Sequence, residues 1–136
     1  MTAPLLIVDA ANVVGSVPDG WWRDRRAAAE RLRDALAPLA EHGLPTSSGA
    51  PPWAIDTPLD VILVVEGAAR GIAPTPAVRV ESAPASGDDL ITTLATRSKT
   101  TNPDRPCLVA TSDRELRARV TAAGAACVGP RAVRPR

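Results

Sequence analysis

The residues Leu5-Leu6-Ile7-Val8-Asp9 decide how this chain is expected to fold. An unbroken apolar run with β-branched residues at its end is typical of a strand that is buried on both faces. An aspartate follows the run directly, and a buried carboxylate is costly unless it is paired or bound to a cation. Such a strand is expected in a parallel sheet, with its acidic end at the edge where open α/β proteins bind ligands.

The same arrangement of an apolar run followed by an acidic residue recurs along the chain. Glu66 follows the run 61–65, and Asp113 follows the run 107–112. A further pair, Asp88-Asp89, opens a stretch with helical periodicity. Carboxylates gathered at one sheet edge repel one another by roughly 4 kcal/mol per pair at 4 Å and an effective dielectric near 20. A divalent cation removes that penalty, so we expect Mg²⁺ or Mn²⁺ to be held in an acidic cleft.

Hydrophobic periodicity and breaker residues place the remaining elements. Strands that alternate with helices indicate a three-layer α/β/α protein with a mostly parallel sheet. We expect one domain over 1–130 and a basic tail over 131–136. The predicted strands are 5–9, 60–65, 77–81 (an outer strand), 107–111 and 125–128, and the predicted helices are 22–37, 86–99 and 112–123.

Three predictions concern the segments between these elements. Residues 10–20 are expected to form a loop, because Gly15, Pro18 and Gly20 interrupt regular structure. Pro38 should kink or end the first helix, since it lacks a backbone donor. Residues 43–58, which are rich in proline and contain Trp53, are expected to form a loop that covers the acidic cleft or leaves it open.

Composition excludes several classes of function. The net charge is +1, so no global electrostatic attraction to nucleic acid is expected, although arginines crowd the segment 23–33. With one histidine, His42, and two cysteines in apolar runs, no Ser-His-Asp, Cys-His or zinc constellation can be built. No basic leader or long apolar run is present, which predicts a cytoplasmic protein without membrane contact.

Each acidic residue also has a purely structural explanation. Asp9 could satisfy backbone amides in a turn, but Asn12 follows at a distance suited to orienting a ligand or water, which favours function. The sequences 86–89 and 112–115 both match a capping box, which accounts for Asp89 without chemistry. Asp113 would lie in the first turn of the helix, where the helix dipole favours an acidic residue. Because neighbouring helical residues point about 100° apart, we expect Asp88 to face the cleft, with Asp89 as a second ligand.

The remaining candidates are open to two interpretations. Glu66 is as readily a surface residue at a strand end as a member of the site. Trp21-Trp22 is expected to serve as core or as a hydrophobic staple, and the alternative is that one ring stacks on a base at the edge of the cleft. Arg23 and Arg26 are candidates for holding the RNA backbone, with a salt-dependent affinity.

Five short motifs, in this order, resemble the NYN domains of the PIN-like nuclease superfamily, and in particular their YacP-like branch. The motifs cover most of the chain. They are Leu-Ile-Val-Asp-Ala-Ala-Asn (6–12), Val-Val-Glu-Gly (64–67), Ser-Gly-Asp-Asp-Leu-Ile (86–91), Ala-Thr-Ser-Asp-Arg-Glu-Leu (110–116) and Ala-Gly-Ala (123–125).

This resemblance implies a parallel sheet in the order 3-2-1-4-5 and Mg²⁺- or Mn²⁺-dependent cleavage of RNA. It implies that Asp9, Asp88 and Asp113 are catalytic metal ligands, and that Glu66 and Asp89 complete the acidic ring. It also implies that Asn12 positions the substrate or a metal-bound water; Ser112, in the same motif as Asp113, is our further substrate-binding candidate.

The chain departs from the usual family pattern at two places. The family commonly has Asp-Gly-Tyr-Asn where this chain has Asp9-Ala10-Ala11-Asn12, and its second strand usually ends in Asp where this chain has Glu66. The leading prediction is a divalent-metal-dependent endoribonuclease acting on single-stranded or structured RNA. The alternatives are a metal-dependent hydrolase of small nucleotides or phosphate esters, and a catalytically degenerate module that binds RNA or protein.

Overall fold

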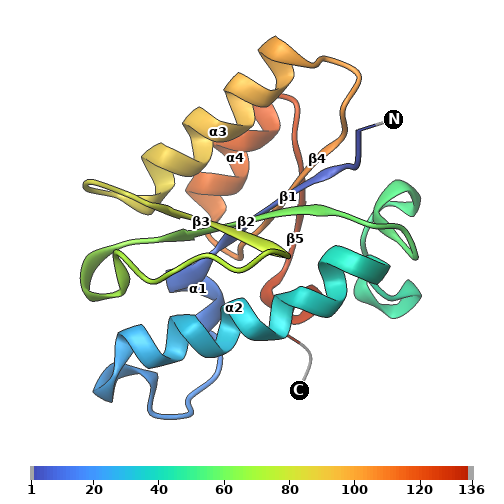
Figure 1. The fold of residues 1–136 in the computed structure, drawn as a ribbon. Coiled ribbons are helices and arrows are strands. Elements are labelled where there is room, and N and C mark those ends of the chain that lie inside the picture. The colour runs from blue at the N-terminus through green and yellow to red at the C-terminus, as the bar shows by residue number, and fades with distance from the viewer. Residues whose placement is uncertain (1, 135–136) are drawn as a thin grey trace.

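A computed structural model describes residues 2–134 as five parallel strands in a single sheet, with helices on both faces (Figure 1). The strand order is β3-β2-β1-β4-β5. The predicted α/β class and the 3-2-1-4-5 order are therefore confirmed. The strands are β1 (Leu5–Asp9), β2 (Asp60–Val65), β3 (Val78–Ser82), β4 (Cys107–Ala110) and β5 (Ala126–Val128).

The first strand lies at the centre of the sheet, as its apolar sequence predicts. Leu6 of β1 lies beside Val61 of β2 and Leu108 of β4. Leu6 and Val8 pack on one face, and Leu5 and Ile7 pack on the other. Both faces of β1 are therefore removed from water, which leaves only its acidic end at an edge.

Two pairs of helices cover the two faces of the sheet (Figure 1). Leu32 and Leu36 of the longest helix pack on the face that holds Leu6, and Ile91 and Leu116 pack on the opposite face. The result is the predicted three-layer arrangement. The first pair is α1 (Ala10–Gly15) and α2 (Arg25–His42), and the second pair is α3 (Gly87–Thr101) and α4 (Arg114–Ala122).

The segment after β1 differs from the predicted loop, because α1 begins at Ala10 with no connecting residues. Asp9 caps this short helix: its side chain accepts a hydrogen bond from the backbone N–H of Asn12. Val13 and Val14 are buried against the core, so packing supports a helix too short to be stable alone. The breakers Pro18 and Gly20 act only after the helix has ended.

Pro38 neither ends nor divides the second helix, which continues to His42. Proline removes one hydrogen bond within a helix, but the residues after it are held by other contacts. Ala40 accepts a hydrogen bond from the backbone N–H of Leu59, at 2.9 Å. The helix ends at Gly43, where φ is +80° and a Cβ would collide with the backbone of Thr57.

The segment 43–58 is an ordered connection at the amino end of the sheet. It contains two 3-10 turns, and Leu44 forms an isolated parallel bridge with Ile55. Trp53 lines a hollow with Ala3 and Pro106, which precede β1 and β4. Of the two predicted arrangements, the segment leaves the acidic cleft open, because the acidic residues lie at the opposite end of the strands.

The C-terminal residues 131–134 pack against the domain. Ala132 and Val133 are buried in the core on the α2 face, and Arg134 pairs with Asp19 at 2.6 Å. The last part of the predicted basic tail, residues 135–136, lies outside the described residues. Across residues 2–134, every helix is too short or too polar to cross a membrane.

Candidate functional site at the carboxyl edge of the sheet

Asp9 is the most deeply buried acidic residue of the predicted site, with an exposed fraction of 5%. One carboxylate oxygen caps α1 through the Asn12 N–H at 3.5 Å, and the other accepts a hydrogen bond from Thr111 Oγ1 at 2.9 Å. The pKa of Asp9 is raised to about 6, mainly by burial and to a smaller extent by the nearby carboxylates of Asp88 and Glu66, against the lowering effect of its two hydrogen bonds. The carboxylate thus sits among like charges at a position that penalises ionisation.

Thr111 links the ends of the two central strands. Its hydroxyl donates to Asp9 and accepts a hydrogen bond from the backbone N–H of Asp113 at 3.2 Å. Its side chain is fully buried. Sequence analysis missed this residue, although the polar Thr-Ser-Asp run after an apolar strand was a signal for it.

Asp113 is the N-cap of α4, where its side chain accepts a hydrogen bond from the Leu116 N–H at 3.0 Å. The predicted capping box that begins at Ser112 is therefore wrong. The Ser112 hydroxyl is engaged elsewhere, because it donates to the Asn12 side-chain oxygen at 3.0 Å, and the Ser112 N–H donates to the same oxygen at 2.9 Å. Asn12 and Ser112 consequently join α1 to the turn that carries Asp113.

Glu66 fastens the end of β2 to the start of α3. Its carboxylate accepts a hydrogen bond from the Gly87 N–H at 3.1 Å, and a Cβ at position 87 would lie 3.3 Å from it. Ser86 caps α3 through the Asp88 N–H at 3.1 Å. The predicted reciprocal bond from Asp89 is replaced by an ion pair with Arg119 at 3.0 Å.

Asp88 and Asp89 therefore have different surroundings. Burial raises the pKa of Asp88, and the nearby carboxylates of Asp113 and Glu66 raise it further, while Arg119 opposes them. The side chain of Asp89 is 72% exposed and points to α4. The structure brings Asp88 together with Asp9, Glu66 and Asp113, and leaves Asp89 outside this group.

These four carboxylates form what we call the acidic edge: Asp9, Glu66, Asp88 and Asp113. None of the four makes an ion pair with a basic side chain among residues 2–134. In the same residues, no three His, Cys, Asp or Glu side chains are close enough to form a metal-binding group. The donor set still fits Mg²⁺ or Mn²⁺ chemically, since it consists of hard carboxylate oxygens, and Mg²⁺ is usually bound by one or two carboxylates and several waters.

Neither of the predicted RNA-binding arginines lines the cavity that borders the acidic edge. Arg26 donates to the backbone carbonyl of Arg70 at 2.5 Å, and so it holds the loop after β2. Arg23 is exposed. The arginine that lines a cavity next to the acidic edge is Arg25, which sequence analysis did not single out.

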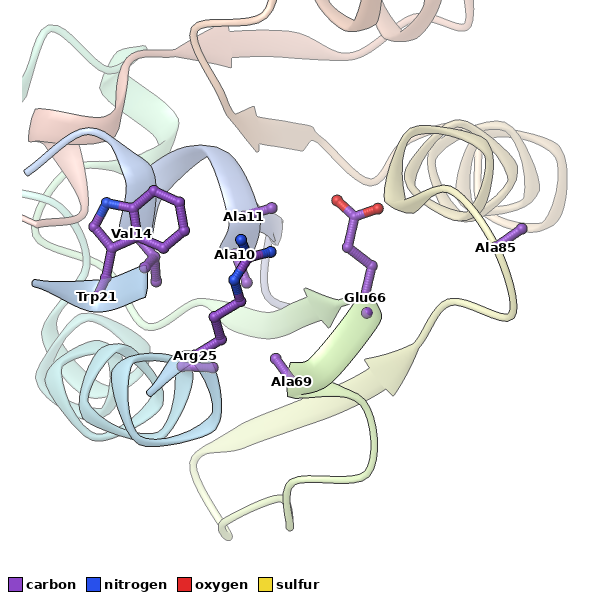
Figure 2. A pocket seen from close by; sticks show the side chains of 10 residues that line it. Ala10, Ala11, Val14, Trp21, Arg25, Glu66, Ala69 and Ala85 are labelled. Atoms are coloured by element: carbon purple, nitrogen blue, oxygen red, sulfur yellow. The ribbon is translucent and has the colours of Figure 1, made fainter. Parts of the chain in front are cut away.

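This cavity has a volume of about 350 Å³ and lies between α1, α2 and the turn after β2 (Figure 2). Figure 2 shows Trp21 and Arg25 on one side, Glu66 on the other, and Ala10 and Ala11 between them. A second hollow of about 340 Å³ borders Ser112 and includes Arg131 and Arg134. The acidic edge is thus flanked by hollows that differ in chemistry, and the one in Figure 2 is mainly apolar.

Comparisons with known proteins agree with this architecture. No protein-family model matches the sequence, and no curated protein matches it. The structure is similar to that of Rae1 (YacP) from Bacillus subtilis, with a TM-score of 0.68 and 21% identity over 95% of this chain and 70% of that one. A tryptophan-to-leucine mutant of the same protein gives a TM-score of 0.67 and 20% identity over 96% and 72%. The chain therefore has the fold of Rae1 (YacP), and the YacP-like fold predicted from its motifs is confirmed.

Proposed function

We propose that this protein is a divalent-metal-dependent endoribonuclease that hydrolyses phosphodiester bonds at the acidic edge. The observation that carries the proposal is the convergence of four carboxylates without a basic partner at the carboxyl end of a parallel sheet. Such crowding destabilises the folded protein. It is explained if the edge binds a cation and the phosphate that accompanies it.

Asp9, Asp88 and Asp113 would hold Mg²⁺ or Mn²⁺, with Glu66 at the border of the site. When bound, the cation lowers the pKa of a water and offsets the charge that develops on the phosphate. The protein's own residues fix the carboxylates: Thr111 and the start of α1 hold Asp9. Because each ligand is anchored to a different element, the site keeps its geometry only when the fold is intact.

Asn12 and Ser112 position the substrate side of the edge. Their mutual hydrogen bonds set the distance between α1 and the turn before α4. His42 is exposed at the end of α2, next to the segment 43–58 at the amino end of the sheet, so it lies away from this site. The chemistry therefore rests on carboxylates and a cation.

One observation favours a second candidate, a module that binds RNA without cleaving it. Residues 2–134 contain no preassembled group of three metal ligands. The two candidates differ in one respect, because only the nuclease requires a divalent cation for its activity. A hydrolase of small nucleotides is disfavoured, because several residues that line the cavity are exposed: Ala11, Arg25, Gly67 and Ala85.

The test is cleavage of end-labelled single-stranded RNA by the wild type and by Asp113→Asn, with Mn²⁺ or with EDTA. Asparagine is also a good N-cap, so the variant should keep α4 and the fold. We expect Mn²⁺-dependent cleavage by the wild type and a loss of roughly 100-fold or more in the variant. Equal cleavage by the two proteins, or cleavage in EDTA, would refute the proposal. A melting temperature that Mn²⁺ does not change and an absence of cleavage would favour the binding module.

A further inference from the structure

We infer that the cavity between α1, α2 and the turn after β2 is a subsite for one unstacked nucleobase of a single-stranded RNA. The inference rests on the proposed function, because it assigns the base next to the phosphate at the acidic edge. It also rests on the shape and lining of the cavity, which do not depend on the metal ligands.

The cavity has the size and walls that a flat ring system needs. Its volume of about 350 Å³ lies at the small end of the range of roughly 300–1,000 Å³ that is typical of ligand pockets. Its walls are formed largely by short apolar side chains: Ala10, Ala11, Val14, Ala29, Ala69 and Ala85. Walls of this kind exclude water from the two faces of a ring without offering the hydrogen bonds that a sugar would need.

The lining of the cavity includes one aromatic ring, that of Trp21. Trp21 packs edge-on against Trp22, with ring centroids 5.9 Å apart and planes at 86°. The guanidinium of Arg25 lies 5.3 Å from the centre of the Trp21 ring. Stacking of a base on an aromatic ring tolerates any sequence, and a nearby arginine adds attraction for the base or its phosphate.

The position of the cavity relates it to the proposed chemistry. Ala10 and Ala11 follow Asp9 directly, and Glu66 belongs both to the cavity wall and to the acidic edge (Figure 2). The Gly87 N–H holds the Glu66 carboxylate in place at this wall. A base in the cavity would therefore carry its own phosphate to the acidic edge, and the site would select an unpaired nucleotide as the place of cleavage.

The experiment measures binding of a labelled RNA pentanucleotide in EDTA, where hydrolysis at the acidic edge is suppressed. We expect Trp21→Ala to weaken binding by roughly tenfold, as for the loss of one base–aromatic stack. Trp21→Phe should restore most of the affinity. Trp22→Ala is the matched control, since Trp22 is 52% exposed and does not line the cavity, and it should stay within about twofold of the wild type.

Two further binding measurements use a second cavity variant and a modified RNA. Ala11→Leu, at an exposed helical position, fills the cavity and should weaken binding even if Trp21→Ala does not fold. A pentanucleotide with one abasic position should lose affinity for the wild type but not for Trp21→Ala. Mononucleotides should bind much more weakly than the pentanucleotide, and equal affinity would overturn the assignment to RNA.

The result separates this inference from the proposed function. If Trp21→Ala and Trp22→Ala bind equally well, or if the wild type binds no pentanucleotide in the millimolar range, the subsite is refuted, even though Mn²⁺-dependent cleavage can still be observed. If binding depends on Trp21 but Mn²⁺ elicits no cleavage, the nuclease proposal fails and the base subsite stands.

Discussion

Acidic residues at the two ends of the sheet differ in whether a basic side chain pairs with them. At the amino end, the carboxylate of Asp60 accepts hydrogen bonds from Arg79 at 2.8 Å and from Arg105 at 2.5 Å. Arg105 also donates to the backbone carbonyl of Ala3 at 2.7 Å, so this group ties β2 to the residues before β1. At the carboxyl end, the four residues of the acidic edge have no such partner within residues 2–134.

The difference is not caused by a shortage of arginines near the acidic edge. Arg117 donates to the backbone carbonyl of Thr111 at 2.8 Å, and Arg119 pairs with Asp89. Both arginines are close to the site, but their hydrogen bonds and ion pairs are made with groups outside the acidic edge. Paired carboxylates thus stabilise the fold at one end, while the carboxylates at the other end have no ion-pair partner among residues 2–134. Under the proposed function, a bound cation would supply the missing positive charge.

The largest expected effect is on RNA cleavage, which should differ between substitutions at the two ends of the sheet. Asp88→Asn should reduce RNA cleavage by roughly 100-fold or more if the acidic edge holds the cation. Asp60→Asn should leave the cleavage rate within about twofold below the melting temperature, because it lies at the other end of the strands. Single-turnover cleavage measures the rate of each variant. A large loss of cleavage in Asp60→Asn alone would show that the amino end of the sheet, and not the acidic edge, carries the activity.

The second effect concerns the free energy of unfolding. The pKa of Asp9 is about 6 in the folded protein against an ordinary value of 3.8, so folding favours its protonated form. Stability from this group is therefore present below pH 4 and is lost as the pH rises to 6. Asp9→Asn should be more stable than the wild type by up to about 3 kcal/mol at pH 7, and no more stable near pH 4.

Urea unfolding of both proteins at pH 7 and pH 4 measures this difference. Asp60→Asn is the matched comparison, and at pH 7 it should be destabilised by about 1–3 kcal/mol because it loses hydrogen bonds to charged groups. A wild type that is more stable than Asp9→Asn at pH 7 would contradict the view that Asp9 is kept ionised at a cost to the fold.

The smallest effect is expected for the exposed ion pair beside the acidic edge. Asp89→Asn should change the free energy of unfolding by less than about 1 kcal/mol, because the pair with Arg119 is accessible to water. Its effect on cleavage should be far below that of Asp88→Asn. Comparable losses in the two variants would show that the acidic edge includes Asp89, as the sequence had suggested.

Sequence patterns sufficed for the three inner strands of the sheet, because they are apolar runs with clear ends. The apolar run 5–8 predicted a buried strand, and β2 has the bounds that were expected, Asp60–Val65. The positions of Asp9, Glu66 and Asp113 at strand ends followed from the same runs. The clustering of three acidic residues was therefore predictable before any side chain was placed.

The details that were mispredicted depend on competition between side chains that are distant in the chain. Ser112 is not the helix cap because Asn12, which lies 100 positions earlier, engages its hydroxyl. Asp89 does not complete a capping box because Arg119 of another helix attracts it. The helix α1 forms because Val13 and Val14 are buried in the core, and this burial cannot be predicted from local helix propensity.

The central place of β1 has a consequence for how the protein is made. Its neighbours β2 and β4 enter from far along the chain, with Leu6 beside Val61 and beside Leu108. During synthesis β1 leaves the ribosome before β2 and β4. Until both strands pair with it, β1 is an exposed apolar segment, and such segments favour aggregation. Because so many contacts are non-local, folding should be slow for a chain of this length. We therefore expect the nascent chain to be most prone to aggregation between the synthesis of β1 and that of β4.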